Sequence, residues 1–225
     1  MTPTLPNITI ANQGLSQWHH DCRQYMLSIN HQFDTSHQID HVDRVLRNAL
    51  QIHQDHPSDL RVIVPAVMLH DCVPIDKNSH LRQQASTLSA EHAKQKLAQW
   101  HYPDHLLSAI GDAIASHSFS ANIPAVSLEA KIVQDADRLD SLGAIGMARC
   151  FMLGGRFGNP LYHENDPTAE CRPLNDKAFT LDHFYTKLLK LHNTFLTETG
   201  KRLALERTQY MQQYIATLLT EINPP

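Results

Sequence analysis

The chain has 225 residues, of which 42% are hydrophobic, so it is long enough to bury a substantial core. Its 19 Lys and Arg against 23 Asp and Glu give a net charge of -4 without a basic tract, which argues against binding of long DNA or RNA. No stretch reaches the ~18 apolar residues expected of a membrane span, and the N-terminus lacks a signal-peptide pattern. Four cysteines without a CxxC pair favour reduced thiols, so we expect a cytoplasmic protein.

Helical periodicity dominates the first part of the chain. From Ser36 onward, apolar residues recur at steps of three and four, which predicts an amphipathic helix with His41 beside its apolar stripe. A nearly continuous apolar run from about 58 to 71 predicts a buried central helix. Pro65 interrupts this run and predicts a kink or a late start.

The middle of the chain alternates between turn-rich and periodic segments. Residues 72–84 are polar and predict a loop at the mouth of a pocket. Helices are expected at 85–100 and at 103–117. Residues 127–154 have helical spacing throughout and predict one long helix.

The C-terminal part is predicted to be a long loop followed by helical structure. The loop covers 154–176, and residues 177–222 contain one or two helices with Gly200 as their joint. No internal repeat and no convincing strand is present, so the fold class is all-α. The expected organisation is a single domain over residues 1–225, in which a core of about 15–155 is covered by the loop 154–176 and the helices 177–222.

Residues of the types that bind metals occur at three separated places in the predicted helices. His41 lies in the first helix, the pair His70-Asp71 ends the buried helix, and the string QDADRLD lies in the helix 127–154. Neutral imidazoles and ionised carboxylates that converge on one point can hold a metal ion. Neighbouring positions on a helix diverge by about 100°, so His70 and Asp71 would flank such an ion rather than both point at it. The acidic string offers three alternatives for a further ligand: Asp135, Asp137 and Asp140.

The order of these segments resembles the HD-domain metal-dependent phosphohydrolases, whose signature is a His, then a His-Asp pair, then a distant Asp. SHQIDHVDRV supplies the first His, MLHD the pair and KIVQDADRLDSLGAIG the last Asp, and DHFYTKLLKL is similar to the tail of small bacterial members. The resemblance runs from about Thr35 to Gly146. It implies an HD-domain helical bundle with an additional C-terminal helical segment, in which Asp140 supports the ligands or packs near them and Asp135 points elsewhere. The implied metal ligands are His41, His70, Asp71 and Asp137.

The implied ligand set of two His and two Asp suits a divalent transition metal better than Mg or Ca. One ion is expected, with Mn as the first choice in the cell and Fe, Co, Ni or Zn as alternatives. When bound, such an ion lowers the pKa of a water molecule from about 16 towards about 7 and polarises a phosphoryl group. The expected reaction is therefore hydrolysis of a phosphoester or phosphoanhydride. Asp71 is expected to orient or deprotonate the water, and Asp76 is an alternative acid or base.

Departures from subfamily patterns narrow the expected substrate. Pro74 and Ile75 stand where HD-type alarmone hydrolases carry an acidic pair and where HD-type deoxynucleoside monophosphatases carry a Glu, which argues against both. Phosphodiesterases of the superfamily use two further His for a second metal, and His92 and His117 fall in the right interval. An exposed role is favoured for His92, whereas His117 is expected to be a pocket residue or a substrate contact.

The remaining similarity is to small bacterial members that act on nucleotides, including release of pyrophosphate from nucleoside triphosphates. A polyphosphate substrate needs cationic partners, because a single metal cannot neutralise all of its charges. An exposed surface role is the alternative for each such cation. The alternative functions are phosphodiesterase activity, phosphatase activity, or a catalytically silent module that binds a nucleotide or a protein. No membrane partner is expected, and a homodimer is left open. The candidate substrate contacts are Lys77, His80, Arg82, His117, Arg138 and Lys187.

Overall fold

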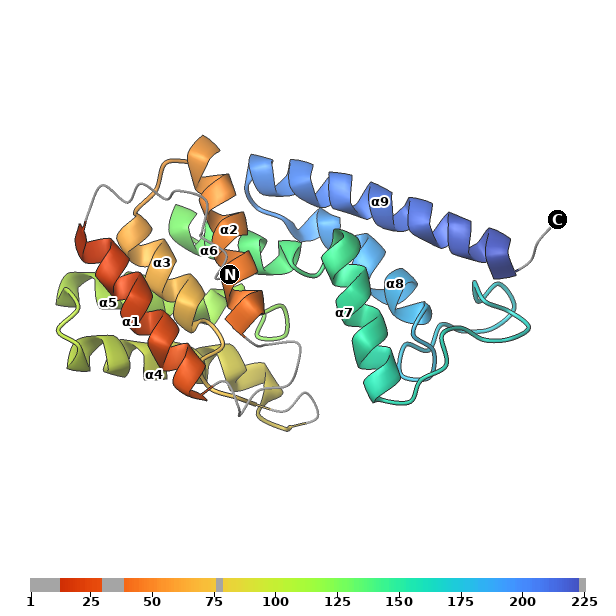
Figure 1. Cartoon of the computed structure of the whole chain (residues 1–225), viewed down its shortest axis with the longest axis horizontal. Helices are drawn as coiled ribbons and strands as arrows, with labels where there is room; N and C mark the ends of the chain where they lie inside the picture. The colour runs from red at the N-terminus through yellow and green to blue at the C-terminus, as the bar shows by residue number, and fades with distance from the viewer. Residues whose placement is uncertain (1–12, 30–38, 76–78, 223–225) are drawn as a thin grey trace, which may run out of the picture.

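The computed structural model of the chain describes residues 13–29, 39–75 and 79–222. Within these ranges it contains helices and connecting segments but no β-strand, which confirms the predicted all-α fold. Figure 1 shows the helices of the first part of the chain bundled at one end of the molecule and the C-terminal helices at the other. The helices are α1 (Gln13–Ile29), α2 (Ile39–Asp55), α3 (Leu60–Leu69), η2 (Arg82–Gln84), α4 (Ala85–Gln99), α5 (Asp104–His117), α6 (Leu128–Leu139), α7 (Gly143–Arg156), α8 (Asp182–Thr186), η3 (Leu188–Thr194) and α9 (Glu198–Ile222).

Helix α3 forms the centre of the bundle and confirms the buried helix predicted from its apolar run. It contacts α1, α2, α4, α5 and α6. All of its residues from Val62 to Leu69 are buried. A helix that is apolar on every side requires such an environment, because each of its faces must be covered by a neighbour. The central helix therefore fixes the position of His70 and Asp71, which follow it directly.

The late start predicted at Pro65 is wrong, since α3 begins at Leu60 and contains the proline. The Asp59 side chain caps the helix by accepting a hydrogen bond from the Arg61 backbone N–H at 2.9 Å. Proline lacks the N–H that would bond to the Arg61 carbonyl one turn earlier. The Tyr102 hydroxyl donates to that carbonyl at 2.6 Å instead. A side chain from the connection between α4 and α5 thus replaces the missing backbone donor.

Helix α1 covers one side of α3 and was not predicted from the sequence. Its buried side chains are Leu15, Cys22 and Met26, which lie on a single face because they are seven and four residues apart. The other positions of α1 are mostly polar, so the periodic signal is confined to this narrow stripe. Packing against α3, rather than a strong pattern of its own, therefore holds the helix in place.

The single helix predicted for 127–154 is wrong, because α6 ends at Leu139 and α7 begins at Gly143. Gly143 has a φ of +67°, a conformation that glycine adopts readily. A Cβ on Gly146 would collide with the Ser141 backbone, so the turn also needs a glycine there. The apolar spacing runs through the break because both helices bury apolar faces in the same core. The turn directs α7 away from the bundle, as Figure 1 shows.

The C-terminal part contains α8, η3 and the long α9, and the prediction that Gly200 is a joint is wrong. Gly200 lies in the first turn of α9, where a Cβ would collide with the Asp135 carboxylate. Asp135 accepts hydrogen bonds from the backbone N–H groups of Leu196 and Thr197 at 3.0 and 2.7 Å, and from the Thr197 hydroxyl at 2.7 Å. Asp135 therefore anchors the start of α9, which agrees with the expectation that it points away from the metal ligands.

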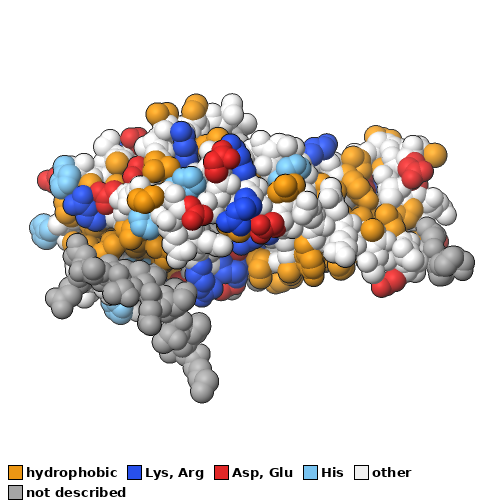
Figure 2. Space-filling model, turned by 90° about the horizontal axis from the view of Figure 1, so that it is seen from above, with side chains coloured by type: hydrophobic (Ala, Val, Ile, Leu, Met, Phe, Trp, Pro, Cys, Tyr) orange, Lys and Arg blue, Asp and Glu red, His pale blue; other side chains and the backbone are white. Residues whose placement is uncertain are grey.

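The buried apolar side chains form one continuous cluster that extends from Leu15 to Ile215. This cluster is consistent with the single domain proposed from the sequence, which stays a prediction. Figure 2 shows acidic and basic side chains interspersed over one face of the molecule, with hydrophobic side chains between them. Among the described residues, no helix is both long enough and apolar enough to span a bilayer.

Candidate metal centre

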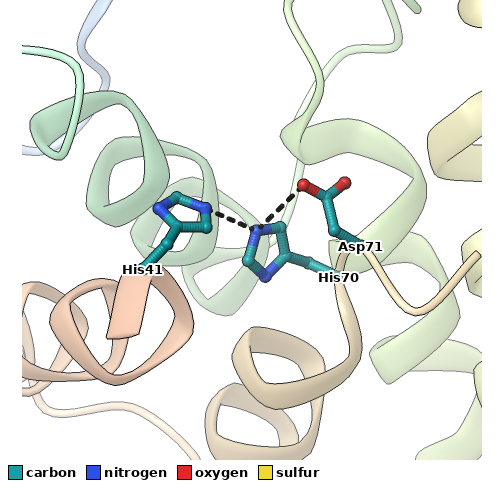
Figure 3. A group of neighbouring side chains, drawn as sticks. All are labelled: His41, His70 and Asp71. Atoms are coloured by element: carbon teal, nitrogen blue, oxygen red, sulfur yellow. Dashed lines mark hydrogen bonds and ion pairs between the residues drawn. The ribbon is translucent and has the colours of Figure 1, made fainter. Parts of the chain in front are cut away.

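The chain brings the predicted metal ligands together from different helices. His41 is in the first turn of α2, His70 and Asp71 follow the last residue of α3, and Asp137 is near the end of α6. Ligand atoms of His41, His70 and Asp71 lie within 4.8 Å of one another (Figure 3). Both histidines are buried, whereas Asp71 keeps a partly exposed side chain. The site therefore consists of two buried histidines and one carboxylate that solvent can reach.

Hydrogen bonds determine which ring nitrogen of each histidine faces the centre. The Nδ1 atom of His41 lies 2.7 Å from Asp140 Oδ2, and that of His70 lies 2.7 Å from the Val67 carbonyl oxygen. Carboxylate and carbonyl oxygens only accept hydrogen bonds, so each Nδ1 carries a proton. The Nε2 atoms of the two rings face each other at 3.3 Å. Two Nε2 lone pairs directed at one point are the arrangement that a metal ion needs.

The carboxylates complete a mixed nitrogen and oxygen set. Asp137 Oδ1 lies 3.4 Å from His41 Nε2 and 3.8 Å from His70 Nε2. Asp71 Oδ2 lies 3.6 Å from His70 Nε2, and Asp71 Oδ1 lies 3.6 Å from His117 Nε2 on its other side. These separations are longer than hydrogen bonds and leave the lone pairs facing a common space. The residues therefore fit a divalent transition metal.

The two imidazoles differ in their protonation. Burial lowers the pKa of His70 to about 4, so this imidazole is neutral near pH 7, as a metal ligand must be. Burial also opposes charge on His41, but its contacts with Asp137 and Asp140 raise its pKa to about 9, so a metal ion would have to displace the Nε2 proton of this imidazole. Burial likewise opposes ionisation of Asp137, yet the close contact with His41 and the nearby His70 and His117 hold its pKa well below the usual range. The centre thus carries an ionised carboxylate beside a neutral imidazole.

Asp140 lies behind His41 and is itself held by two arginines. Its Oδ1 accepts from Arg44 Nε at 2.7 Å, and its Oδ2 accepts from Arg149 Nη1 at 2.6 Å. Asp140 is 1% exposed, so these cations offset the cost of burying its charge. Arg44 and Arg149 were not predicted from the sequence, and no spacing rule could have found Arg149. Its contact with Asp140 depends on the turn between α6 and α7.

The metal centre opens into a cavity of about 560 Å³ between the bundle and the C-terminal part. His41, Asp71 and Asp137 belong to its wall. Near His117, the Phe119 ring contacts two cations, since the Arg138 guanidinium carbon and Lys187 Nζ each lie 5.5 Å from the ring centre. Arg82, Arg138, Arg149, Lys177 and Lys187 all contribute to the wall. The cavity therefore combines a metal centre with basic side chains.

Most predicted substrate contacts lie in this cavity, but not all. Arg82, His117, Arg138 and Lys187 line it. His80 is exposed and is absent from the described part of the lining, so the structure does not bring it to the site. The sequence also proposed Asp76 and Lys77, which lie outside the described residues.

His92, considered as a further metal ligand, lies elsewhere. It is half-buried rather than exposed, because its Nε2 pairs with the Tyr25 hydroxyl at 2.6 Å. It belongs to no metal-ligand group among the described residues.

Comparisons with known proteins agree with this geometry. The HD domain family model matches residues 39–142, which include all four proposed ligands. The uncharacterised protein YpgQ from Bacillus subtilis is 31% identical over 205 residues, covering 89% of this chain and 91% of that protein. The chain belongs to the HD-domain family. This HD-domain protein is thus a hydrolase of the metal-dependent phosphohydrolase type.

Solved structures of similar proteins extend over nearly the whole HD-domain chain. The structure of Bacillus subtilis YpgQ in complex with ADP has a TM-score of 0.73 at 28% identity, covering 93% of this chain and 97% of the other. An HD-superfamily hydrolase from Bacillus thuringiensis has a TM-score of 0.73 at 29% identity, covering 94% of this chain and 100% of the other. The similarity therefore includes the C-terminal helices as well as the bundle.

Proposed function

We propose that this HD-domain hydrolase cleaves nucleoside triphosphates into a nucleoside monophosphate and pyrophosphate. The observation that carries the proposal is one cavity in which the His41, His70, Asp71 and Asp137 centre opens beside Arg82, Arg138 and Lys187. A binding site for a polyphosphate needs both a metal and fixed cations. The structure of YpgQ with ADP supports a nucleotide as the ligand class in this family.

The reaction consumes one water molecule. Its oxygen bonds to the α-phosphorus, the bond from that phosphorus to the bridging oxygen breaks, and pyrophosphate leaves while the water proton is released. A divalent ion bound by the four ligands would supply Lewis acidity and favour ionisation of water, with Mn as our first choice over Fe, Co, Ni or Zn.

The side chains around the centre have distinct proposed roles. Asp71 presents Oδ2 toward His70 and Oδ1 toward His117, so it is placed to orient the attacking water and accept its proton. His117 donates its Nδ1 proton to the Ile114 carbonyl at 2.6 Å, which directs Nε2 toward Asp71 and the cavity. Burial opposes its charge, but the contact with Asp71 raises the pKa of His117. We assign His117 to a phosphate oxygen.

The cations on the cavity wall are proposed to hold the departing pyrophosphate. Arg138 is fixed by a hydrogen bond from its Nη1 to the Thr194 carbonyl at 2.8 Å. Lys187 and Arg138 both lie 5.5 Å from the centre of the Phe119 ring, which helps to position both cations. Charge that develops on the leaving group is stabilised by such preorganised donors. Lys77 and the alternative acid or base Asp76 remain proposals from the sequence alone.

The proposal is tested by a panel of ribo- and deoxyribonucleoside triphosphates with added Mn, in which the products are identified by phosphorus NMR. We expect pyrophosphate and monophosphate, and a loss of about a hundredfold or more in Asp71→Asn, because that change removes a ligand and the proposed base. His80→Ala is the matched control, since His80 is exposed and outside the described cavity wall. Three outcomes would overturn the proposal. Release of orthophosphate would favour a phosphatase, cleavage of bis-p-nitrophenyl phosphate alone would favour a phosphodiesterase, and no hydrolysis would favour a binding module.

A further inference from the structure

Helix α9 joins the C-terminal part of the molecule to the helices that carry the metal ligands. It contacts α2, which carries His41, and α6, which carries Asp137, as well as α7. In Figure 1, α9 begins beside the bundle and extends away from it. Arg207, on α9, makes hydrogen bonds to both α2 and α6. A side chain from the C-terminal helix thus reaches two of the helices that form the metal centre.

The Arg207 guanidinium divides its hydrogen bonds between these two helices. Its Nη1 donates to the Leu139 carbonyl at 2.6 Å, and its Nη2 donates to Asn48 Oδ1 at 2.9 Å. Leu139 is the last residue of α6, where carbonyl groups lack a helical partner and a nearby cation is favourable. Arg207 therefore caps the end of α6 and at the same time holds a side chain of α2.

Asn48 continues this link to the residue beside a metal ligand. Its Nδ2 donates to the carbonyl of Ala136, directly before Asp137, at 3.0 Å. Asn48 is 7% exposed, so its amide relies on these protein partners rather than on water. It lies on the same face of α2 as His41, because the two residues are about two helical turns apart. The bonded pair of Arg207 and Asn48 thus fixes α2 against α6 along the face that carries His41.

The stem of Arg207 packs on the turn that follows α6. A Cβ on Gly143 would lie 3.1 Å from Arg207 Cγ, so the glycine leaves room for this side chain. The same turn carries Asp140, whose Oδ2 lies 2.7 Å from His41 Nδ1. Arg207 is therefore in contact with the turn that orients the His41 imidazole, as well as with both ligand-bearing helices.

We infer that Arg207 is a positioning residue for the metal centre, which acts through Asn48 and the end of α6. The alignment of α2 with α6 sets the distance between two ligand atoms, His41 Nε2 and Asp137 Oδ1, which lie 3.4 Å apart. Ligand atoms must be held within about 0.5 Å of the productive geometry for a site to bind well. The C-terminal helix is thus part of the metal-binding arrangement, whichever phosphorylated substrate is cleaved.

Arg207→Met tests this inference, because methionine keeps an apolar stem over Gly143 but removes both hydrogen bonds. We expect Mn to bind about tenfold more weakly, as measured by competition with a chelating dye. Arg202→Met is the matched control, since Arg202 lies on the same helix, is 56% exposed and pairs with Glu206. The variants are compared under conditions in which circular dichroism shows them to be folded. Unchanged Mn affinity in Arg207→Met, or an equal loss in Arg202→Met, overturns the inference.

Arg207→Lys is the milder variant should Arg207→Met fail to fold. Lysine keeps the cation but not the rigid fork that reaches two acceptors, so Mn binding should again be weaker than in the wild type. Full wild-type affinity in Arg207→Lys would show that the charge alone suffices, and it would overturn positioning through the two hydrogen bonds.

A double-mutant cycle tests the route of the effect. Asn48→Ala removes the bridge between Arg207 and Ala136, so it should also weaken Mn binding. Because the two changes break one link, the Arg207→Met and Asn48→Ala double variant should lose less affinity than the product of the single losses. Losses that multiply, as they do for independent sites, overturn the inference.

The same variants keep this inference separate from the proposed function. Pyrophosphate release from nucleoside triphosphates is measured in parallel with the Mn affinities. No pyrophosphate from a wild type that shows the expected Mn affinities overturns the proposed function alone. No Mn binding by the wild type overturns the inference together with the metal centre.

Discussion

The orientation of His41 shows how a residue that cannot touch the metal can control its binding. Asp140 fixes the His41 proton on Nδ1 and thereby leaves the Nε2 lone pair for the centre. Arg44 and Arg149 hold the Asp140 carboxylate ionised in a buried position. The histidine, the aspartate and the arginines therefore act as one hydrogen-bonded unit behind the ligand.

We predict that Asp140→Asn weakens binding of Mn by about ten- to a hundredfold, because an amide can no longer hold both arginines and fix the His41 proton. Asp40→Asn is the matched control. Asp40 also pairs with Arg44, at 2.6 Å, but it is 65% exposed and does not bond to His41. Dissociation constants from competition with a chelating dye would measure the effect. Equal affinities of Asp140→Asn and the wild type would show that His41 needs no such support.

The metal ligands were predictable, whereas their partners were not. His41, His70, Asp71 and Asp137 were proposed because their order along the chain resembles a known signature. Arg149 contacts Asp140 only because the chain turns between α6 and α7. A role that depends on a turn of this kind has no periodic trace in the sequence.

Among the elements, the connection between α7 and α8 has the clearest single anchor. Arg172 donates to Asp182 at 2.6 and 2.8 Å, and the backbone N–H of Asn175 donates to Asp182 at 2.6 Å. The Asp182 side chain is fully buried, so these bonds are made away from water. They hold residues 172–175 against the first turn of α8, next to Asp176 and Lys177, which line the cavity.

We predict that Asp182→Asn lowers the free energy of unfolding at pH 7 by about 2 kcal/mol, because hydrogen bonds to a charged group are lost. In the folded state, the hydrogen bond with Arg172 lowers the pKa of Asp182 below its ordinary value of 3.8. The carboxylate therefore stabilises the fold fully above the unfolded pKa, and this contribution is lost as the pH falls through the folded pKa. Urea unfolding at a series of pH values should show the difference between variant and wild type shrinking on acidification. A difference that is constant with pH would contradict this account, and Glu164→Gln, which changes an exposed carboxylate in the same connection, should show almost none.

The positions of the helices were predicted well from the sequence, whereas their ends were predicted poorly. The helix at 85–100 was confirmed as α4 because its borders carry a turn-rich loop and a Pro. The break between Leu139 and Gly143 was missed, since apolar residues keep helical spacing on both sides of it. The joint was predicted at Gly200, but the connection lies at 195–197. Gly200 lacks a side chain at a position where the Asp135 carboxylate needs the space, and it does not form a turn.

At the scale of the whole molecule, the cavity exists because the C-terminal helices pack beside the bundle. Figure 1 shows α7, α8 and α9 extending from the end of α6, and residues from both parts line the cavity. The bundle contributes the metal centre, and the C-terminal part contributes Lys187, Asp176 and His183. Substrate specificity is therefore expected to reside in the C-terminal part.

We propose that one divalent ion, which hydrolysis requires, is held by His41, His70, Asp71 and Asp137. Calorimetric titration of Mn into the metal-free chain tests it most directly, alongside His70→Ala and the matched control His80→Ala. We predict one ion per chain for the wild type and for His80→Ala, and loss of binding by about a hundredfold or more in His70→Ala. Undiminished binding in His70→Ala, or no binding in the wild type, would contradict it.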